Sequence, residues 1–188
     1  MEMNESQRPE GEVQQAIRAK LENERRDKKD RRRWLIGTVL LLLLIFLLFR
    51  VFFGIAIVEG NSMAPNYQES DLVLYTRIHG ELERGDVVLA EADDGRILLL
   101  KRVAGLPGEE VYIDERTGSV MIDGKEQTEE YANGVTRRTV IQEYPITLGE
   151  EEYFLLGDNR ENSMDSREYG PVSSDQIGGK VLAVFRKN

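Results

Sequence analysis

A single apolar segment of membrane-spanning length constrains this chain more than any other feature. Residues 34–49 carry no charged side chain, Arg50 interrupts, and residues 51–58 continue the apolar character. As a helix rising about 1.5 Å per residue, residues 34–58 extend roughly 37 Å, enough to cross a hydrocarbon core of about 30 Å with some tilt. The alternative is a cleaved secretory signal peptide. It fits less well, because thirty-three residues precede the segment and it is longer than a signal-peptide core.

The charges before this segment predict its orientation. Residues 1–33 contain ten Lys or Arg, seven of them within residues 25–33, and eight Asp or Glu. Basic residues beside a membrane span stay on the cytoplasmic side. We therefore expect a cytoplasmic basic tail over 1–33, a transmembrane anchor over 34–58, and an extracytoplasmic domain over 59–188.

The composition of residues 59–188 excludes several classes of function. Fourteen Lys or Arg stand against twenty-six Asp or Glu, which disfavours a nucleic-acid partner, since phosphate binding needs clustered cations. The chain has no cysteine and a single histidine, His79. Disulfides and a thiol nucleophile are thereby excluded, and a histidine metal cluster or a histidine-based triad is disfavoured. We expect no metal and no cofactor.

The outer domain reads as mostly β. Seven short β-type runs are separated by turn signals: 72–76, 87–90, 97–103, 111–114, 120–122, 153–156 and 180–185. Residues 111–123 have the pattern of a β-hairpin, and residues 126–144 are polar and weakly patterned. The expected fold is one antiparallel β-domain, a folded barrel or double sheet, on a single transmembrane helix.

Two residues are candidates for chemistry when cysteine is absent and histidine nearly so. Ser62 follows the anchor by four residues, in a Gly60-Asn61-Ser62 turn, and Lys101 follows four apolar residues. A desolvated lysine has a lowered pKa and can act as a base. The residues alone leave a second interpretation open, in which Lys101 reaches from a strand end to a surface acid. A serine at the membrane surface would suit a substrate that is itself held in the bilayer.

A third segment, residues 157–167, strengthens the first interpretation. It follows an apolar run and contains acids, arginines and serines at close spacing. Such a loop offers a serine to hold a lysine amine, and acid–arginine pairs to fix its own conformation.

Together the segments resemble bacterial type I signal peptidases, membrane-bound Ser/Lys endopeptidases that remove signal peptides from exported proteins. The matching motifs, in the order of the family, are Ser62-Met63-x-Pro65, Arg84-Gly85-Asp86-Val87-Val88, Lys101-Arg102-Val103-x-Gly105-x-Pro107-Gly108 and Gly157-Asp158-Asn159-Arg160-x-x-Ser163-x-Asp165-Ser166-Arg167. The resemblance covers roughly residues 34–188. The single anchor and short outer domain resemble the shorter, Gram-positive-like form.

The resemblance implies a role for each matching residue. Ser62 would be the nucleophile, Lys101 the neutral general base, and Ser163 the residue that orients the Lys101 amine. The backbone N–H of Ser62 would donate to the oxyanion. Many relatives carry a second donor, a serine two residues before the nucleophile, where this chain has Gly60.

Further implied roles concern the surroundings of the dyad. Asp158 with Arg102, and Asp165 with Arg167, would form structural ion pairs. This chain departs from the common family pattern at three positions. It has Asn66 where threonine is common, Ala90 where an aromatic residue is common, and Glu109 where aspartate is common.

The resemblance also implies the partners. The substrates would be exported preproteins that carry small residues, typically Ala, at the first and third positions before the cut. Their extended segment would add as a strand to the domain. We predict Val58, Met63 and Leu100 as pocket walls, with ordinary packing as the alternative role. The lipid bilayer would be the second partner, and the sequence carries no signal for an oligomeric state.

Three rival functions differ in sequence features. A repressor-type Ser/Lys autoprotease shares the dyad but has no membrane anchor. A β-lactamase or penicillin-binding protein places Lys three residues after Ser, whereas 39 residues separate Ser62 from Lys101. A catalytically degenerate, membrane-tethered homologue that only binds signal peptides would have no need of both Ser62 and Lys101.

Overall fold

The computed structural model describes residues 10–92 and 97–186. The chain divides into two units, Met1–Phe49 and Arg50–Asn188. The described residues of the first unit all belong to helix α1, Glu10–Phe52, whose last residues belong to the second unit. Its stretch Ile17–Phe52 is long and apolar enough to cross a membrane, and its large apolar side chains are exposed.

The helix ends earlier than the sequence suggests. It stops at Phe52, and the next residues form strand β1, Phe53–Ile57, although the apolar pattern places them in the anchor. The physical reason is pairing: β1 runs antiparallel to β2, Leu72–Thr76, over its whole length. Gly54 permits this approach, because a Cβ there would lie 2.2 Å from the Tyr75 ring. The helical part of the apolar segment, residues 34–52, is therefore about 28 Å long.

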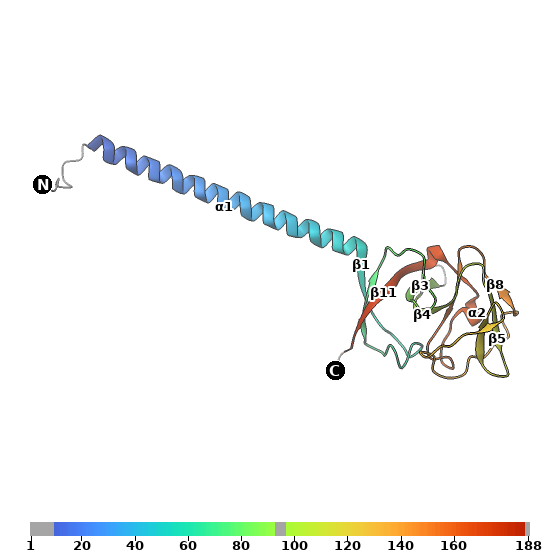
Figure 1. Ribbon diagram of the computed structural model, residues 1–188. Coiled ribbons are helices and arrows are strands. Elements are labelled where there is room, and N and C mark those ends of the chain that lie inside the picture. The colour runs from blue at the N-terminus through green and yellow to red at the C-terminus, as the bar shows by residue number, and fades with distance from the viewer. Residues whose placement is uncertain (1–9, 93–96, 187–188) are drawn as a thin grey trace. The chain divides into compact units, whose positions relative to one another are not determined.

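Seven strands form the larger sheet of the outer domain, in the order β1-β2-β11-β3-β4-β9-β10. All neighbouring pairs are antiparallel. The strands not yet bounded are β3 (Val87–Ala92), β4 (Ile97–Gly105), β9 (Glu152–Leu156), β10 (Val172–Ser173) and β11 (Ile177–Phe185). In Figure 1, β11 runs beside β3 at one side of the domain.

A smaller sheet has the order β7-β6-β5-β8. Its strands are β5 (Glu110–Asp114), β6 (Ser119–Ile122), β7 (Lys125–Glu126) and β8 (Ile146–Thr147). Figure 1 places β5 and β8 at the side of the domain away from β11. The outer domain also contains two short helices, α2 (Ser166–Tyr169) and the 3-10 helix η2 (Ser174–Gln176).

Strand β9 joins the two hydrophobic cores. Tyr153 and Leu155 belong to the core of the larger sheet, while Phe154 and Leu156 belong to the core formed with β5 and β6. Successive side chains of a strand point to opposite faces, so β9 is buried on both. This explains its unbroken apolar run and gives residues 157–167, which follow it, a rigid starting point.

The predicted fold class is confirmed: an antiparallel, mostly β domain follows one apolar N-terminal helix. Each of the seven predicted strands lies within one of β2, β3, β4, β5, β6, β9 or β11. The predicted hairpin is the β5–β6 pair. Strand β1 and the two-residue strands β7, β8 and β10 have no predicted counterpart.

We expect Gly105→Val to destabilise the outer domain. A Cβ at this position would lie within 2.9 Å of Val111, Leu148 and Phe154, where the two sheets meet. Overpacking of this kind costs about 1–3 kcal/mol, so thermal unfolding of the detergent-solubilised chain should begin at a lower temperature. Gly80→Val is the matched control, because a Cβ there meets no atom within 4 Å. Equal melting of both variants would contradict this packing.

Candidate active site

The two candidate catalytic side chains meet in the structure. Lys101 lies on β4, and Ser62 lies in the turn that follows β1. The Lys101 Nζ is 2.8 Å from the Ser62 Oγ and donates a second hydrogen bond to the Leu100 carbonyl at 3.1 Å. Lys101 is only 3% exposed, and Ser62 is half-buried. A hydroxyl and an amine at this distance can exchange a proton directly.

Burial tunes Lys101 toward the neutral form. It lowers the pKa of the Lys101 amine from 10.5 to about 8, because the charged form loses its hydration. The negative charge of Asp165 opposes this effect, and the positive charge of Arg167 adds to it. Near neutral pH, part of the population therefore carries an amine that can accept a proton.

The turn that carries Ser62 is fastened to the loop after β9. The backbone N–H of Asn159 donates to the Ser62 carbonyl at 3.0 Å, and its side-chain amide donates to the Asn61 carbonyl at 3.1 Å. The backbone N–H of Asp158 contacts the Met63 sulfur at 3.4 Å. These contacts hold Ser62 against the loop that follows the doubly buried strand β9.

A buried ion pair connects that loop to strand β4, which carries Lys101. Arg102, next to Lys101, binds Asp158 through two hydrogen bonds of 2.7 and 2.6 Å. The Asp158 side chain is fully buried, and Asn66 donates to it at 2.9 Å. Removing one partner of such a pair would leave an uncompensated buried charge, which is strongly destabilising. The two parallel hydrogen bonds also fix the orientation of Arg102 relative to Asp158.

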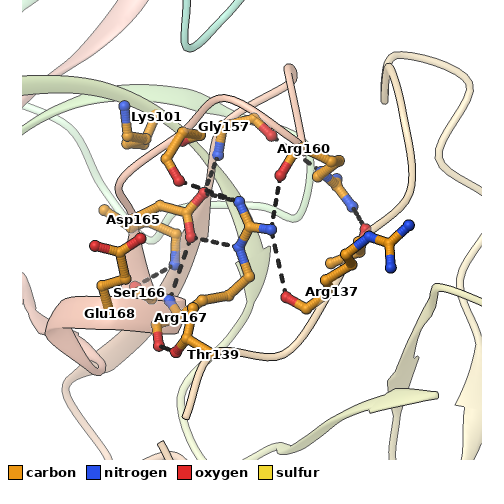
Figure 2. Close-up of polar contacts among 12 residues, drawn as sticks. Lys101, Arg137, Thr139, Gly157, Arg160, Asp165, Ser166, Arg167 and Glu168 are labelled. Carbon is orange, nitrogen blue, oxygen red and sulfur yellow. Dashed lines mark hydrogen bonds and ion pairs between the residues drawn. The ribbon is translucent and has the colours of Figure 1, made fainter. Parts of the chain in front are cut away.

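A second buried pair shapes the far end of the loop. Arg167 binds Asp165 through Nε at 2.8 Å and Nη2 at 2.9 Å, and Asp165 accepts the Gly157 N–H at 2.9 Å. Arg167 also donates to the Arg160 carbonyl at 2.8 Å. Figure 2 shows the Asp165 carboxylate facing the Arg167 guanidinium, with Gly157 above them. The pair thus closes residues 157–167 into a fixed loop.

Ser163 makes no hydrogen bond to the Lys101 amine in this structure, and its role in orienting this amine stays a prediction. Its hydroxyl is buried and has no hydrogen-bond partner among the described residues. Ser163 packs against Gly157 instead: a Cβ on Gly157 would lie 2.1 Å from the Ser163 Oγ and 2.5 Å from the Ser62 carbonyl oxygen. In this structure Ser62 and the Leu100 carbonyl hold the amine.

The backbone before Ser62 explains the glycine at position 60. Gly60 has φ +77°, a left-handed conformation that disfavours other residues, and open space where a Cβ would stand. No hydrogen bond within residues 10–92 and 97–186 uses the backbone N–H of Ser62. That donor is therefore free for a ligand.

Of the three predicted pocket residues, two line one cavity and the third does not. Val58 and Leu100 line a cavity of about 370 Å³, together with Ala56, Ile57, Glu59, Val73, Leu89 and Leu98. We call it the Val58 cavity. Met63 does not line it. It is 1% exposed, and its sulfur is turned to the Asp158 backbone.

Comparison with known proteins decides the family. Residues 31–186 match the family model described as "Signal peptidase, peptidase S26". The chain belongs to the signal peptidase family. Signal peptidase I of Bacillus licheniformis is 31% identical over 163 residues, which cover 81% of this chain and 87% of the relative. Signal peptidase I S of Bacillus subtilis is 32% identical over 170 residues, covering 84% and 90%. A crystal structure of a signal peptidase I from Enterococcus faecalis V583, 28% identical, aligns with a TM-score of 0.45 over 55% of this chain and 98% of that one.

The range that matches the signal peptidase family includes Ser62, Lys101 and the whole loop 157–167. Among the described residues, no group of three or more His, Asp or Glu side chains could hold a metal ion.

The sequence did not reveal the supporting role of residues 126–144. Arg160 binds Glu129 at 2.7 and 2.8 Å and donates to Thr136 at 2.7 Å, while the Tyr131 ring stacks on Arg102 at 4.2 Å. Asn133 accepts the Arg160 N–H and donates to the Asp158 carbonyl. This polar segment therefore fixes the loop 157–167 from outside. Its pattern contains no strand or helix period that would place it there.

We expect kcat/KM to rise with pH through an apparent pKa of about 8, in line with the lowered pKa of Lys101. Only the neutral amine accepts a proton, so the active fraction should fall roughly tenfold per unit below that value. Initial rates on a peptide substrate across the pH range measure this limb. A rate that stays constant between about pH 7 and 9 would contradict the assignment of Lys101 as base.

We expect Gly157→Ala to lower kcat/KM about 100-fold, because its Cβ would push both Ser163 and the Ser62 carbonyl out of place. Thermal melting of the same sample shows whether the domain remains folded. Gly178→Ala is the control, since its nearest contact, the Leu89 carbonyl at 3.6 Å, is an ordinary one. Full activity of Gly157→Ala would exclude a tight requirement at this position.

Proposed function

We propose that this protein is a membrane-bound serine endopeptidase that removes N-terminal signal peptides from exported preproteins, cleaving after small residues of the Ala-x-Ala type. The observation that carries the proposal is the 2.8 Å contact between a buried lysine amine and the Ser62 hydroxyl. The names of the relatives support the substrate class.

The reaction begins when neutral Lys101 takes the proton from the Ser62 hydroxyl. The Ser62 Oγ then bonds to the scissile carbonyl carbon, and the free backbone N–H of Ser62 donates to the developing oxyanion. Protonated Lys101 returns the proton to the leaving amine as the C–N bond breaks. An acyl-enzyme ester on Ser62 remains, and water must hydrolyse it.

An unpaired strand edge suits the binding of an extended substrate. One edge of β4 pairs with β3. The other edge pairs with β9 only from Arg102 to Gly105, so among the described residues the stretch from Ile97 to Lys101 is unpaired on that edge. A signal peptide could add there through main-chain hydrogen bonds, with alternate side chains entering the Val58 cavity beside Leu98 and Leu100.

The exposed face of the outermost strands supports the lipid bilayer as a partner. Strands β1, β2 and β11 are neighbours in the sheet, and their pairing register places the exposed side chains of Ile55, Ile57, Leu72 and Phe185 on one face. An exposed apolar face of this kind favours contact with lipid. With α1 as anchor and its basic tail in the cytoplasm, the catalytic domain would lie on the outer side.

Ser163 keeps its predicted orienting role within this proposal. Its buried hydroxyl lacks a partner, and it borders Gly157, which in turn borders Ser62. An unpaired buried hydroxyl costs about 1–3 kcal/mol, which is the kind of cost that a functional residue carries.

We expect Ser62→Ala and Lys101→Ala each to reduce cleavage of a preprotein with an Ala-x-Ala site by at least roughly 10³-fold. The assay uses the full chain in proteoliposomes and follows the mature product on a gel. Ser174→Ala and Lys125→Ala are matched controls away from the dyad. An intact substrate with the unmodified chain, or cleavage by Lys101→Ala, would overturn the proposal.

A further inference from the structure

The anchor and the first strand of the outer domain together have the three-part pattern of a secretory signal peptide. Residues 25–33 are rich in basic side chains, and residues 34–49 form an uncharged apolar run. Gly54-Ile55-Ala56 follows, which places small residues at the third and first positions before the bond between Ala56 and Ile57. A basic stretch, an apolar run and a small-x-small end define the cleavage site of a signal peptide. The chain therefore resembles a substrate of the reaction that we propose for it.

The structure places this small-x-small segment outside the helix. Helix α1 ends at Phe52, and β1 begins at Phe53. The segment therefore already has the extended conformation that a peptide adopts when it adds to a strand edge. Its conformation alone does not prevent cleavage, so another feature of the fold must protect the bond.

Main-chain pairing supplies this protection. Strand β1 pairs with β2 over its whole length, from Phe53 opposite Thr76 to Ile57 opposite Leu72. To bring the Ala56 carbonyl to the Ser62 of a second copy, β1 must leave this sheet. The main-chain groups that β2 had satisfied would then lose their partners, which opposes the opening.

Two contacts of the side chains add to the pairing. The Tyr75 ring lies so close to Gly54 that a Cβ on Gly54 would be 2.2 Å from it, and Tyr75 itself is buried. Ala56 lines the Val58 cavity of its own domain. While β1 stays in place, Ala56 forms a wall of this cavity and cannot enter it as a substrate residue. Cleavage therefore requires a second copy and an opened β1.

The pairing is also local in sequence. Residues 58–71 form the whole connection between β1 and β2. Hairpin-like contacts of this kind form in about 1–10 μs, whereas a typical enzyme turns over only about 1–10³ times per second. Strand β1 can thus be paired before a peptidase reaches it.

We propose that the bond between Ala56 and Ile57 is a cryptic signal-peptidase site, and that pairing of β1 with β2 protects it from a second copy of the chain. The inference rests on the proposed peptidase function. Hydrolysis at this site adds one water across the amide and leaves a carboxylate on Ala56 and an amine on Ile57. It separates residues 57–188 from helix α1.

A synthetic peptide of residues 40–61 tests the site, because it presents the segment without β2. Incubated with the full chain in detergent, it should yield a fragment that ends at Ala56, identified by mass spectrometry. The peptide contains no second small-x-small pair, so the position of the cut is diagnostic. The same peptide with Ala56→Leu is the matched control. It should be cut at least roughly 100-fold more slowly, because the proposed specificity rejects a large side chain before the cut.

The Ser62→Ala chain tests the protection, because it cannot cut other copies but can be cut by them. Isotope-labelled Ser62→Ala chain is mixed with the unmodified chain in proteoliposomes. We expect its Ala56–Ile57 bond to be cut at least roughly 100-fold more slowly than that of the peptide, since only the opened population is a substrate.

Tyr75→Ala in the labelled Ser62→Ala chain removes the ring that lies against Gly54. We expect faster amide hydrogen exchange in β1 and faster release of the fragment that begins at Ile57. The expected result is the same if Tyr75→Ala unfolds the domain, because β1 is then unpaired as well.

A reference preprotein with an Ala-x-Ala site distinguishes failure of this inference from failure of the proposed function. If the full chain cuts the preprotein but leaves the peptide intact, or cuts the peptide at another bond, the cryptic site is wrong and the peptidase function stands. If the labelled chain is cut as fast as the peptide, or Tyr75→Ala stays intact although its β1 amides exchange rapidly, the protection is wrong. If the preprotein stays intact, both fail.

Discussion

The contact between a buried lysine amine, Lys101, and the Ser62 hydroxyl depends on the arrangement of the whole outer domain. A lysine in water keeps a pKa near 10.4 and is a poor base at neutral pH. Burial on β4 lowers the pKa of Lys101 to about 8, but a buried amine is tolerated only when its hydrogen bonds are satisfied. Ser62 and the Leu100 carbonyl provide two of these bonds. The strand must therefore be rigid, and the turn with Ser62 must be held against it.

That second requirement is met by a short series of contacts through the loop 157–167. Asn159 holds the Ser62 turn, and Asp158, its neighbour, binds Arg102, which is next to Lys101 on β4. Ser62 and Lys101 are thereby linked through a few contacts, although they lie 39 positions apart in the chain. Residues 126–144 brace the same loop from outside through Glu129 and Arg160. These ion pairs are buried and have a defined hydrogen-bond geometry, so they can fix the conformation of the loop. Ion pairs on the surface contribute little to stability.

The alternation of side chains along β3 and β4 divides the surroundings of the base into two spaces. Leu98 and Leu100 line the Val58 cavity, while Leu99 and Lys101 line a second cavity of about 250 Å³. A single strand thus borders two separate spaces, one on each of its faces. In β9 the same alternation joins two cores and fixes the origin of the loop 157–167.

Local patterns in the sequence determined much of this protein. The apolar run indicated the helix, period-two runs indicated seven strands, and the absence of cysteine with a single histidine left Lys101 as the candidate base for Ser62. Only the tertiary structure decided what depends on distant neighbours. Pairing with β2 ends the helix at Phe52, the contact with Asp158 turns Met63 inward, and Ser163 packs against Gly157. Periodicity reports which face of an element is apolar. It does not report which distant residue covers that face, so these contacts could not be predicted from the chain alone.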